Sequence, residues 1–457
     1  MSNANSASLY ESAKKIYPRE MGGKFANLSK LATVSLLGLF YAVPWLMWND
    51  RQAILFDLPA RKFYLLELTL WPQDFPYLAL LLIIAALSLF FFTALAGRLW
   101  CGFACPQTVW TEAFIWMEQL TEGTRSQRMK LDKAPWSWNK LRRKGSKQFL
   151  WITFSLWTGF TFVGYFSPIR ELSHEIMTLS VGGWTAFWGI FYGFATYGNA
   201  GYMREQVCKY MCPYARFQSA MFDKDTLIIS YDEARGEPRG GRKRSVNANE
   251  AGLGDCIDCT LCVQVCPTGI DIRDGLQYEC IACAACIDAC DSVMDKMNYP
   301  RGLVRYTTEH ALQQGETQVI RPRMIVYAAL LVLLIGVLVT SMSMRTPIIL
   351  DVIRDRNALY RELPGNIIEN SYTIKLINQS NSAREFRLSV TGVEGITLNG
   401  VADTVLVDGG GVLSLPVRAR AHRENAYGIM KIDFIVKALD DNDDMIIEDS
   451  RFLGPTP

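Results

Sequence analysis

The chain has 457 residues, of which half are hydrophobic and a fifth are charged, and its net charge is only +2. This composition is more apolar than that of an ordinary soluble protein, and the length allows several domains. The overall charge indicates little by itself, and we interpret the short basic run 239–244 as a solvated or lipid-headgroup-facing surface and not as a nucleic-acid site.

Five uncharged stretches predict transmembrane helices. Each has at least 18 residues, and a helix needs roughly 20 to cross the hydrocarbon core of a bilayer. Inside lipid a helix satisfies its own backbone polar groups, and charged residues flank these stretches, which argues against buried helices of a soluble core. The first stretch begins too far along the chain to be a cleaved signal peptide. The predicted spans are 31–48, 77–97, 149–169, 181–203 and 324–344.

The loop charges predict the orientation of these spans. The segment 98–148 carries ten Lys or Arg residues, whereas the loop 49–76 carries three. Because positively charged loops stay in the cytoplasm, we expect the tail 1–30, the segment 98–148 and the long region 218–323 on the cytoplasmic side. The C-terminal region 345–457 then lies on the opposite side of the membrane.

All twelve cysteines fall between residues 101 and 290, on the predicted cytoplasmic side, where thiols stay reduced. This distribution indicates metal sites and not disulfides. Eight of them form two C-x2-C-x2-C-x3-C motifs, typical of two-cluster ferredoxins, in which the fourth cysteine of each motif binds the other cluster. Zinc sites need pairs with a longer gap. In a ferredoxin domain of about 247–300, the predicted ligands are Cys256, Cys259, Cys262 and Cys290 for one [4Fe–4S] cluster and Cys280, Cys283, Cys286 and Cys266 for the other.

The other four cysteines form two Cys-x3-Cys-Pro elements within the region 31–217, each of which follows an apolar stretch and an arginine, Arg98 or Arg204. Parallel repeats bring equivalent ends together at one membrane face, so we expect the four thiols to meet beneath the ferredoxin domain. Cysteines at i and i+4 share a helix face about 6 Å apart, a spacing that favours a shared soft ion over a disulfide. Thiolates select Cu(I), zinc or iron–sulfur clusters, and copper is the redox-active single ion. The alternative is that these cysteines are small buried hydrophobes. The candidate copper ligands are Cys101, Cys105, Cys208 and Cys212.

The histidine count excludes one class of quinol-oxidising subunit. The chain has three histidines, His174, His310 and His422, which are expected in an outer loop, the inner linker and the outer tail. A membrane haem held by two histidines therefore has no ligands here.

The C-terminal region is predicted to form a β-sandwich. From Asn370 apolar residues alternate with polar ones, with Tyr372, Ile374 and Leu376 on one side, and turn signals separate several such runs. No catalytic group of residues is visible there, so we interpret this region as a docking module or a structural cap.

Three long blocks resemble the FixG/CcoG family of cytochrome c oxidase accessory proteins: CGFACPQTVWTE, CPYARFQSAMFDKDTLIISYDEARGEPR and GDCIDCTLCVQVCPTGIDIRDGLQYECIACAACIDACD. The resemblance implies a bacterial inner-membrane protein with a periplasmic immunoglobulin-like domain that helps to assemble the cbb3-type oxidase. It further implies that Cu(II) is reduced to Cu(I) before delivery, and that Cys101, Cys105, Cys208 and Cys212 match the copper-linked motifs. Oxidase assembly factors, a copper-exporting ATPase and periplasmic copper-delivery proteins are the implied partners.

The sequence thus predicts a multi-domain membrane protein with five transmembrane helices, a cytoplasmic ferredoxin-like domain and a periplasmic β-sandwich. Its predicted function is electron transfer to copper, as a cupric reductase. The alternatives are a quinol dehydrogenase-type polyferredoxin subunit and a scaffold that binds copper without turnover. The lipid bilayer and a second copy of the chain are further expected partners, nucleic acid is not an expected partner, and the electron donor is left open.

Overall fold

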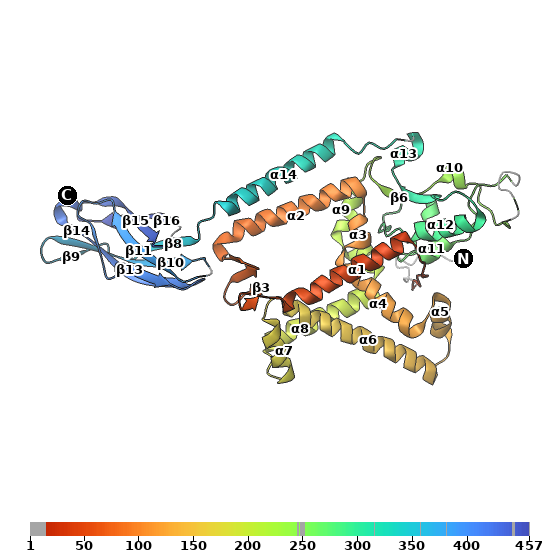
Figure 1. Ribbon diagram of the computed structural model, residues 1–457, viewed down its shortest axis with the longest axis horizontal. Helices are drawn as coiled ribbons and strands as arrows, with labels where there is room; N and C mark the ends of the chain where they lie inside the picture. The colour runs from red at the N-terminus through yellow and green to blue at the C-terminus, as the bar shows by residue number, and fades with distance from the viewer. Residues whose placement is uncertain are drawn as a thin grey trace, which may run out of the picture. The chain divides into compact units, whose positions relative to one another are not determined.

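A computed structural model describes residues 15–244, 246, 252–314, 316–356, 358–380, 382–440 and 444–456. The chain divides into two compact units (Figure 1). The first unit comprises Met1–Tyr64 and Trp71–Gly336, and the second comprises Leu65–Leu70 and Val337–Pro457. All twelve cysteines belong to the first unit, so the candidate metal sites lie within it.

Three helices of the described chain are long and apolar enough to cross a membrane. They are α1 (Lys24–Ala42) with the 3-10 turn η1 (Val43–Trp45), α2 (Phe75–Ala96) and α14 (Pro322–Ser343). The predicted spans 77–97 and 324–344 agree with α2 and α14 to within two residues at each end. The predicted span 31–48 begins seven residues late, because α1 extends at its N-terminal end beyond the uncharged run.

The other two predicted spans fall on helices of a different kind. The span 149–169 lies on α6 (Trp138–Val163), whose first half is charged and which ends six residues before the predicted end. The span 181–203 is divided between α8 (Gly183–Thr196) and the π-helix η3 (Tyr197–Met203). Three long apolar helices indicate membrane association, and the number of five spans stays a prediction.

Glycines allow α6 and α8 to pack closely. A Cβ atom on Gly159 of α6 would lie 2.1 Å from the carbonyl oxygen of Gly189 and 2.8 Å from the backbone nitrogen of Gly193. Small residues permit such close approach of two helix backbones, as is common for helices in membranes.

Short elements connect these helices. Between α1 and α2 lie β1 (Met47–Trp48), β2 (Arg51–Gln52), β3 (Ile54–Asp57), β4 (Lys62–Leu65), β5 (Leu68–Leu70) and η2 (Pro72–Asp74). Between α2 and the ferredoxin region lie α3 (Leu99–Phe103), α4 (Pro106–Glu122), α5 (Arg125–Lys133), α7 (Ile169–Met177), η4 (Val207–Met211) and α9 (Pro213–Met221).

The ferredoxin region contains a two-stranded antiparallel sheet and several short helices. Its elements are β6 (Ile228–Tyr231), α10 (Glu233–Gly236), α11 (Leu261–Val265), η5 (Ile272–Asp274), α12 (Ala285–Met297), β7 (Val304–Thr307) and α13 (Glu309–Gln314). The buried side chains of Ile229 and Val304, from β6 and β7, pack in one core with Ile287 of α12. This packed region therefore extends beyond 247–300 at both ends.

A carboxylate of α12 joins the ferredoxin region to the first membrane helix. Asp288 accepts the backbone N–H groups of Ala26 at 2.7 Å and of Phe25 at 3.3 Å, in the first turn of α1. These are donors that a helix leaves unsatisfied at its N-terminus, and a negative charge is favourable there. The bonds hold the start of α1 against the second cysteine motif.

The second unit is a sandwich of two antiparallel sheets (Figure 1). One sheet has the order β12–β14–β10–β8 with β9 also paired to β10, and the other has the order β13–β11–β15–β16. The strands are β8 (Ile348–Arg354), β9 (Arg361–Leu363), β10 (Ile367–Asn378), β11 (Arg384–Thr391), β12 (Thr397–Asn399), β13 (Thr404–Val407), β14 (Val412–His422), β15 (Ile429–Ala438) and β16 (Met445–Leu453), with the 3-10 turn η6 (Arg423–Asn425). Tyr372, Ile374 and Leu376 of β10 point into its core, which confirms the predicted alternation.

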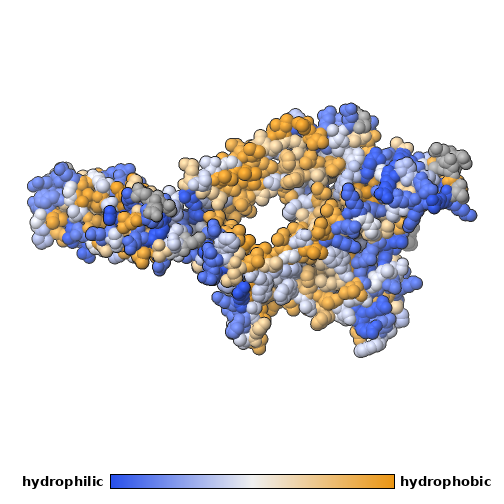
Figure 2. Space-filling view, viewed as in Figure 1, coloured by the Kyte–Doolittle hydropathy of each residue, from blue (hydrophilic) through white to orange (hydrophobic). Residues whose placement is uncertain are grey.

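The surface of the first unit is divided by polarity. Figure 2 shows hydrophobic side chains gathered over α2 and around α1, and hydrophilic side chains over the ferredoxin region. Many large apolar side chains of α2 are exposed, including those of Leu81, Leu82 and Phe92. In a water-soluble unit such a surface would be unusually large, whereas it suits contact with lipid.

Candidate metal-binding sites

The two ferredoxin motifs have the same backbone conformation. In the first motif Asp258 and Thr260 have φ values of 52° and 57°, and at the equivalent positions of the second motif Ala282 and Ala284 have φ values of 54° and 61°. Left-handed conformations are uncommon for residues other than glycine, so their repetition marks a shared loop geometry. Directly after these loops the chain enters α11 and α12, respectively.

Two cavities of the ferredoxin region bring the predicted ligands together in interleaved sets. One cavity is lined by Cys256, Cys259, Cys262 and Cys290. The other is lined by Cys266, Cys280, Cys283 and Cys286, together with Cys262. Each predicted set of three cysteines from one motif and one from the other thus lines a single cavity, and apolar side chains such as those of Leu261 and Ile270 complete the walls.

The donor chemistry of these cavities fits [4Fe–4S] clusters. No three His, Cys, Asp or Glu side chains in the described part of the chain converge as ligands of one metal ion do. A cubane cluster does not require this, because each thiolate binds a separate iron atom. A bound cluster would supply one-electron transfer.

Burial raises the pKa of two predicted ligand thiols, those of Cys262 and Cys290. It raises the pKa of Cys262 to about 11, with Asp271 and Cys259 adding to the rise and Arg273 opposing it. Burial likewise raises the pKa of Cys290 to about 12. Since metals bind thiolates, cluster insertion must displace the protons of these thiols.

The Cys-x3-Cys-Pro elements differ from the predicted geometry. Cys101 lies in α3 and Cys208 in the π-helix η4, but Cys105 and Cys212 lie outside these helices in extended conformations, with ψ values of 129° and 110°. The prediction that each pair shares one helix face is therefore wrong. The reason is the proline after the second cysteine, which disfavours helical geometry in the residue before it and begins the next helix, α4 or α9.

The two elements nevertheless meet. Burial raises the pKa of Cys101 to about 12, and Cys105 and Cys208 contribute to the rise. Burial also raises the pKa of Cys208 to about 11, with contributions from Cys105 and Cys212. Thiols of one Cys-x3-Cys-Pro element thus interact electrostatically with thiols of the other, so the four thiols lie close enough for their charges to interact. The thiol of Cys101 also donates to Oε1 of the fully buried Gln218 at 3.4 Å.

Two residues beside Cys101 connect this four-thiol group to the second cluster motif. The buried guanidinium of Arg98 donates to the carbonyl oxygens of Tyr278, of Cys280 at 3.3 Å and of Ala215 at 2.6 Å. A Cβ atom on Gly102 would lie 2.8 Å from the carbonyl oxygens of both Ile281 and Ala282. The backbone between Cys101 and Cys105 is therefore in direct contact with the loop that carries Cys280 and Cys283.

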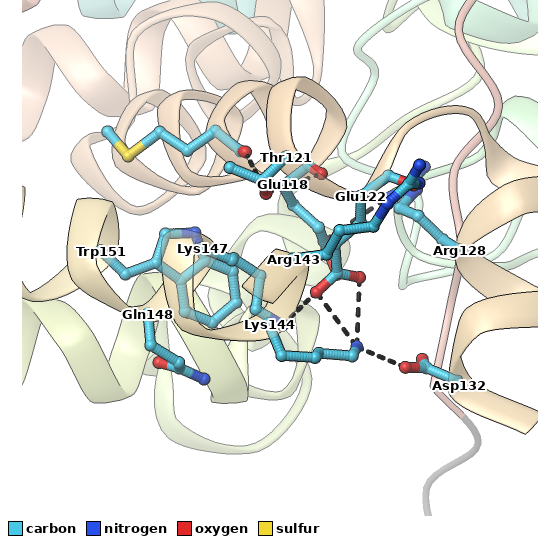
Figure 3. A network of polar contacts seen from close by, with 12 residues as sticks. Glu118, Thr121, Glu122, Arg128, Asp132, Arg143, Lys144, Lys147, Gln148 and Trp151 are labelled. Carbon is cyan, nitrogen blue, oxygen red and sulfur yellow. Dashed lines mark hydrogen bonds and ion pairs between the residues drawn. The ribbon is translucent and has the colours of Figure 1, made fainter. Parts of the chain in front are cut away.

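A buried ion-pair network positions the second element. Glu118 of α4 has no exposed surface and binds Arg204, which precedes Cys208, at 2.8 Å and Arg128 at 3.4 Å. Burial alone would raise the pKa of Glu118, but these cations outweigh it and hold the pKa below its ordinary value. One turn later Glu122 binds Lys144 at 3.0 Å and Lys147 at 2.9 Å (Figure 3). Sequence analysis missed this network, although two glutamates four residues apart on one helix are a visible signal.

Comparison with known proteins identifies the family. A model described as an immunoglobulin-like fold at the C-terminus of FixG, putative oxidoreductase, matches residues 338–455. A 4Fe–4S dicluster domain matches residues 203–309, and a 4Fe–4S binding domain matches residues 78–121. Protein RdxB of Cereibacter sphaeroides is 40% identical over 419 residues, which cover 87% of this chain and 86% of that protein. The chain belongs to the FixG family.

Two further relatives that cover most of the chain agree with this assignment. The nitrogen fixation protein FixG of Rhizobium meliloti is 37% identical and covers 88% of this chain and 83% of its own length. Protein RdxA of Cereibacter sphaeroides is 39% identical and covers 93% and 90%. A crystal structure of a FixG-related protein from Vibrio parahaemolyticus is 34% identical and covers 24% of this chain and 98% of its own, with a TM-score of 0.22. This FixG-family chain is thus a membrane-associated iron–sulfur electron-transfer protein.

Proposed function

We propose that the chain reduces Cu(II) to Cu(I), with electrons passing from the ferredoxin region to copper at the four-thiol group. The observation that carries this proposal is the contact of Gly102 and Arg98 with the loop of Cys280 and Cys283. It sets soft sulfur ligands beside a predicted one-electron carrier. Soft thiolates favour Cu(I) over Cu(II), so a site of this chemistry favours the reduced product.

The reaction balances without a further reactant. A cluster held by the ferredoxin cysteines would supply one electron, and one Cu(II) ion that takes up this electron becomes Cu(I). The four thiols do not converge on one point in the described structure, so copper binding is expected to draw them together and to release their protons. The family resemblance supports delivery of this Cu(I) to a cbb3-type oxidase through assembly factors, a copper-exporting ATPase and periplasmic copper carriers.

A third iron–sulfur cluster is a second candidate occupant of the four thiols. The match of a 4Fe–4S binding domain to residues 78–121 favours it, because only Cys101 and Cys105 lie in that range and Cys208 and Cys212 could complete the ligand set. Metal analysis of the anaerobically purified protein separates the two occupants. About eight iron atoms per chain with copper uptake supports the copper site, whereas about twelve iron atoms supports a third cluster.

We further propose an inner-membrane protein with five spans, a cytoplasmic N-terminus and ferredoxin region, and a periplasmic β-sandwich. The lysine and arginine content of 98–148 supports this orientation. A reporter that is active only in the periplasm should be active when fused after Pro457 and silent when fused after Arg244. The reverse pattern would place the cysteines on the periplasmic side of the membrane and would contradict the proposed orientation.

A further inference from the structure

A pocket of about 800 Å³ lies between the first membrane helix, α4 and the second cluster motif. Its lining includes Val34 of α1 together with Ile115 and Trp116 of α4. The lining also includes Cys283 and, from the four-thiol group, Cys208. Residues of a helix suited to lipid and predicted metal ligands thus line the same pocket.

The carboxylate of Glu112 lines this pocket and accepts hydrogen bonds from side chains of α1. Oε2 of Glu112 accepts the hydroxyl groups of Ser29 at 2.8 Å and of Thr33 at 2.9 Å. Its second oxygen, Oε1, makes no such bond within the described residues. Burial raises the pKa of Cys283, and the Glu112 carboxylate adds to this rise, so the carboxylate lies within electrostatic reach of the second cluster motif.

We propose that this pocket binds a membrane hydroquinone, which serves as the electron donor of the protein. The volume is in the range of pockets that hold a ring with part of an apolar tail. The wall from α1 and α4 suits the tail, and Glu112 suits a ring hydroxyl, which can donate a hydrogen bond to a carboxylate oxygen. The inference extends the proposed function by naming its donor, and it does not require copper as the acceptor.

The donor reaction balances with the groups named above. A hydroquinone loses both hydroxyl protons and two electrons and becomes a quinone. Glu112 accepts the first proton and passes it to water, after which it accepts the second. The two electrons leave one at a time, and the clusters that the eight ferredoxin cysteines would hold would accept one electron each.

The test uses the full-length protein in detergent with a short-chain quinone that carries a photoreactive azide. Wild-type protein should be labelled on peptides from α1 and α4, and excess unlabelled quinone should suppress the labelling. Thr111→Trp fills the pocket without removing a cysteine and should weaken quinone binding by about tenfold or more, a loss of about 1.4 kcal/mol.

A second variant keeps the shape of the pocket but removes the proton acceptor. Glu112→Gln should bind the quinone within about threefold of wild type, yet slow reduction of the clusters by the hydroquinone by about 10²-fold. Glu171→Gln, at an exposed position of α7, serves as the matched control and should leave both quinone binding and the rate of cluster reduction unchanged.

The outcomes separate this inference from the proposed function. After reduction by dithionite and removal of the excess reductant, both pocket variants should reduce Cu(II) as wild type does. Labelling elsewhere in wild type, or hydroquinone-driven reduction in Glu112→Gln at the rate of wild type, would overturn the donor site. Failure of the dithionite-reduced wild-type protein, freed of excess reductant, to reduce Cu(II) would overturn the copper proposal and leave the donor site standing.

Discussion

Replacing Gly102 by alanine perturbs the contact between the four-thiol group and the second cluster motif. The added Cβ would lie 2.8 Å from the carbonyl oxygens of Ile281 and Ala282, whereas ordinary contact begins at 3.4 Å. One of the two loops must therefore move by roughly 0.6 Å, the difference between these distances. All three of the nearest atoms belong to the backbone, so no flexible side chain can turn away. Overpacking of this kind costs about 1–3 kcal/mol of stability.

The matched control is Gly145→Ala in α6, where nothing lies within 4 Å of the added atom. Alanine favours a helix over glycine by about 1 kcal/mol at both positions, so the difference between the two variants isolates the clash. Both proteins should keep their iron. In an anaerobic stopped-flow experiment, Gly102→Ala should reoxidise more slowly than Gly145→Ala after mixing with Cu(II). Equal stability and equal rates in the two variants would refute the reasoning that this contact connects the sites.

Other variants test the supporting structure. Glu118→Gln should lower the free energy of unfolding by about 3–5 kcal/mol, because the buried arginines that bind it lose their counter-charge; chemical denaturation measures this. Cations hold the pKa of Glu118 below its ordinary value, and bonds to lysines do the same for Asp132 against the effect of burial. Carboxylates of this kind stabilise the fold at pH values above the pKa that they have in the unfolded chain. The free energy of unfolding should therefore be level above about pH 5 and fall below about pH 4 as these groups are protonated. Denaturation curves at graded pH measure this, and greater stability in acid would contradict it. Cys256→Ala should remove one cluster and leave the other partly formed, whereas unchanged iron would show that Cys256 is not a ligand. Tyr372→Phe removes the bond from the hydroxyl to the Arg451 carbonyl at 2.9 Å and should cost about 1 kcal/mol of stability in the second unit, which calorimetry would detect.

Local patterns made part of this structure predictable. The cysteine spacing is set by how a short loop wraps around a cluster, so the interleaved grouping of Cys290 with the first motif and Cys266 with the second could be predicted without a structure. The inward face of β10 could be predicted from the alternation of apolar and polar residues, because side chains alternate between the two faces of every strand.

Contacts between distant segments were not predictable. Arg98 reaches the carbonyl of Cys280 across 182 residues, and Glu118 reaches Arg204 across 86. Neither pairing has a periodic signal, because it depends on how the helices pack. The shared helix face expected for Cys101 and Cys105 failed for a local reason: the proline after Cys105 imposes an extended conformation that spacing alone does not reveal.

Replacement of all four of Cys101, Cys105, Cys208 and Cys212 by serine tests the central claim most directly. Serine is close to cysteine in shape but is a hard, weak ligand for copper. The variant should retain about eight iron atoms per chain, since the eight ferredoxin cysteines are untouched. After dithionite reduction and removal of excess reductant, wild-type protein should form one Cu(I) for each electron stored, and the variant should bind no Cu(I) and reduce Cu(II) far more slowly. Cu(II) reduction and copper binding at wild-type levels in the four-serine variant would contradict the account.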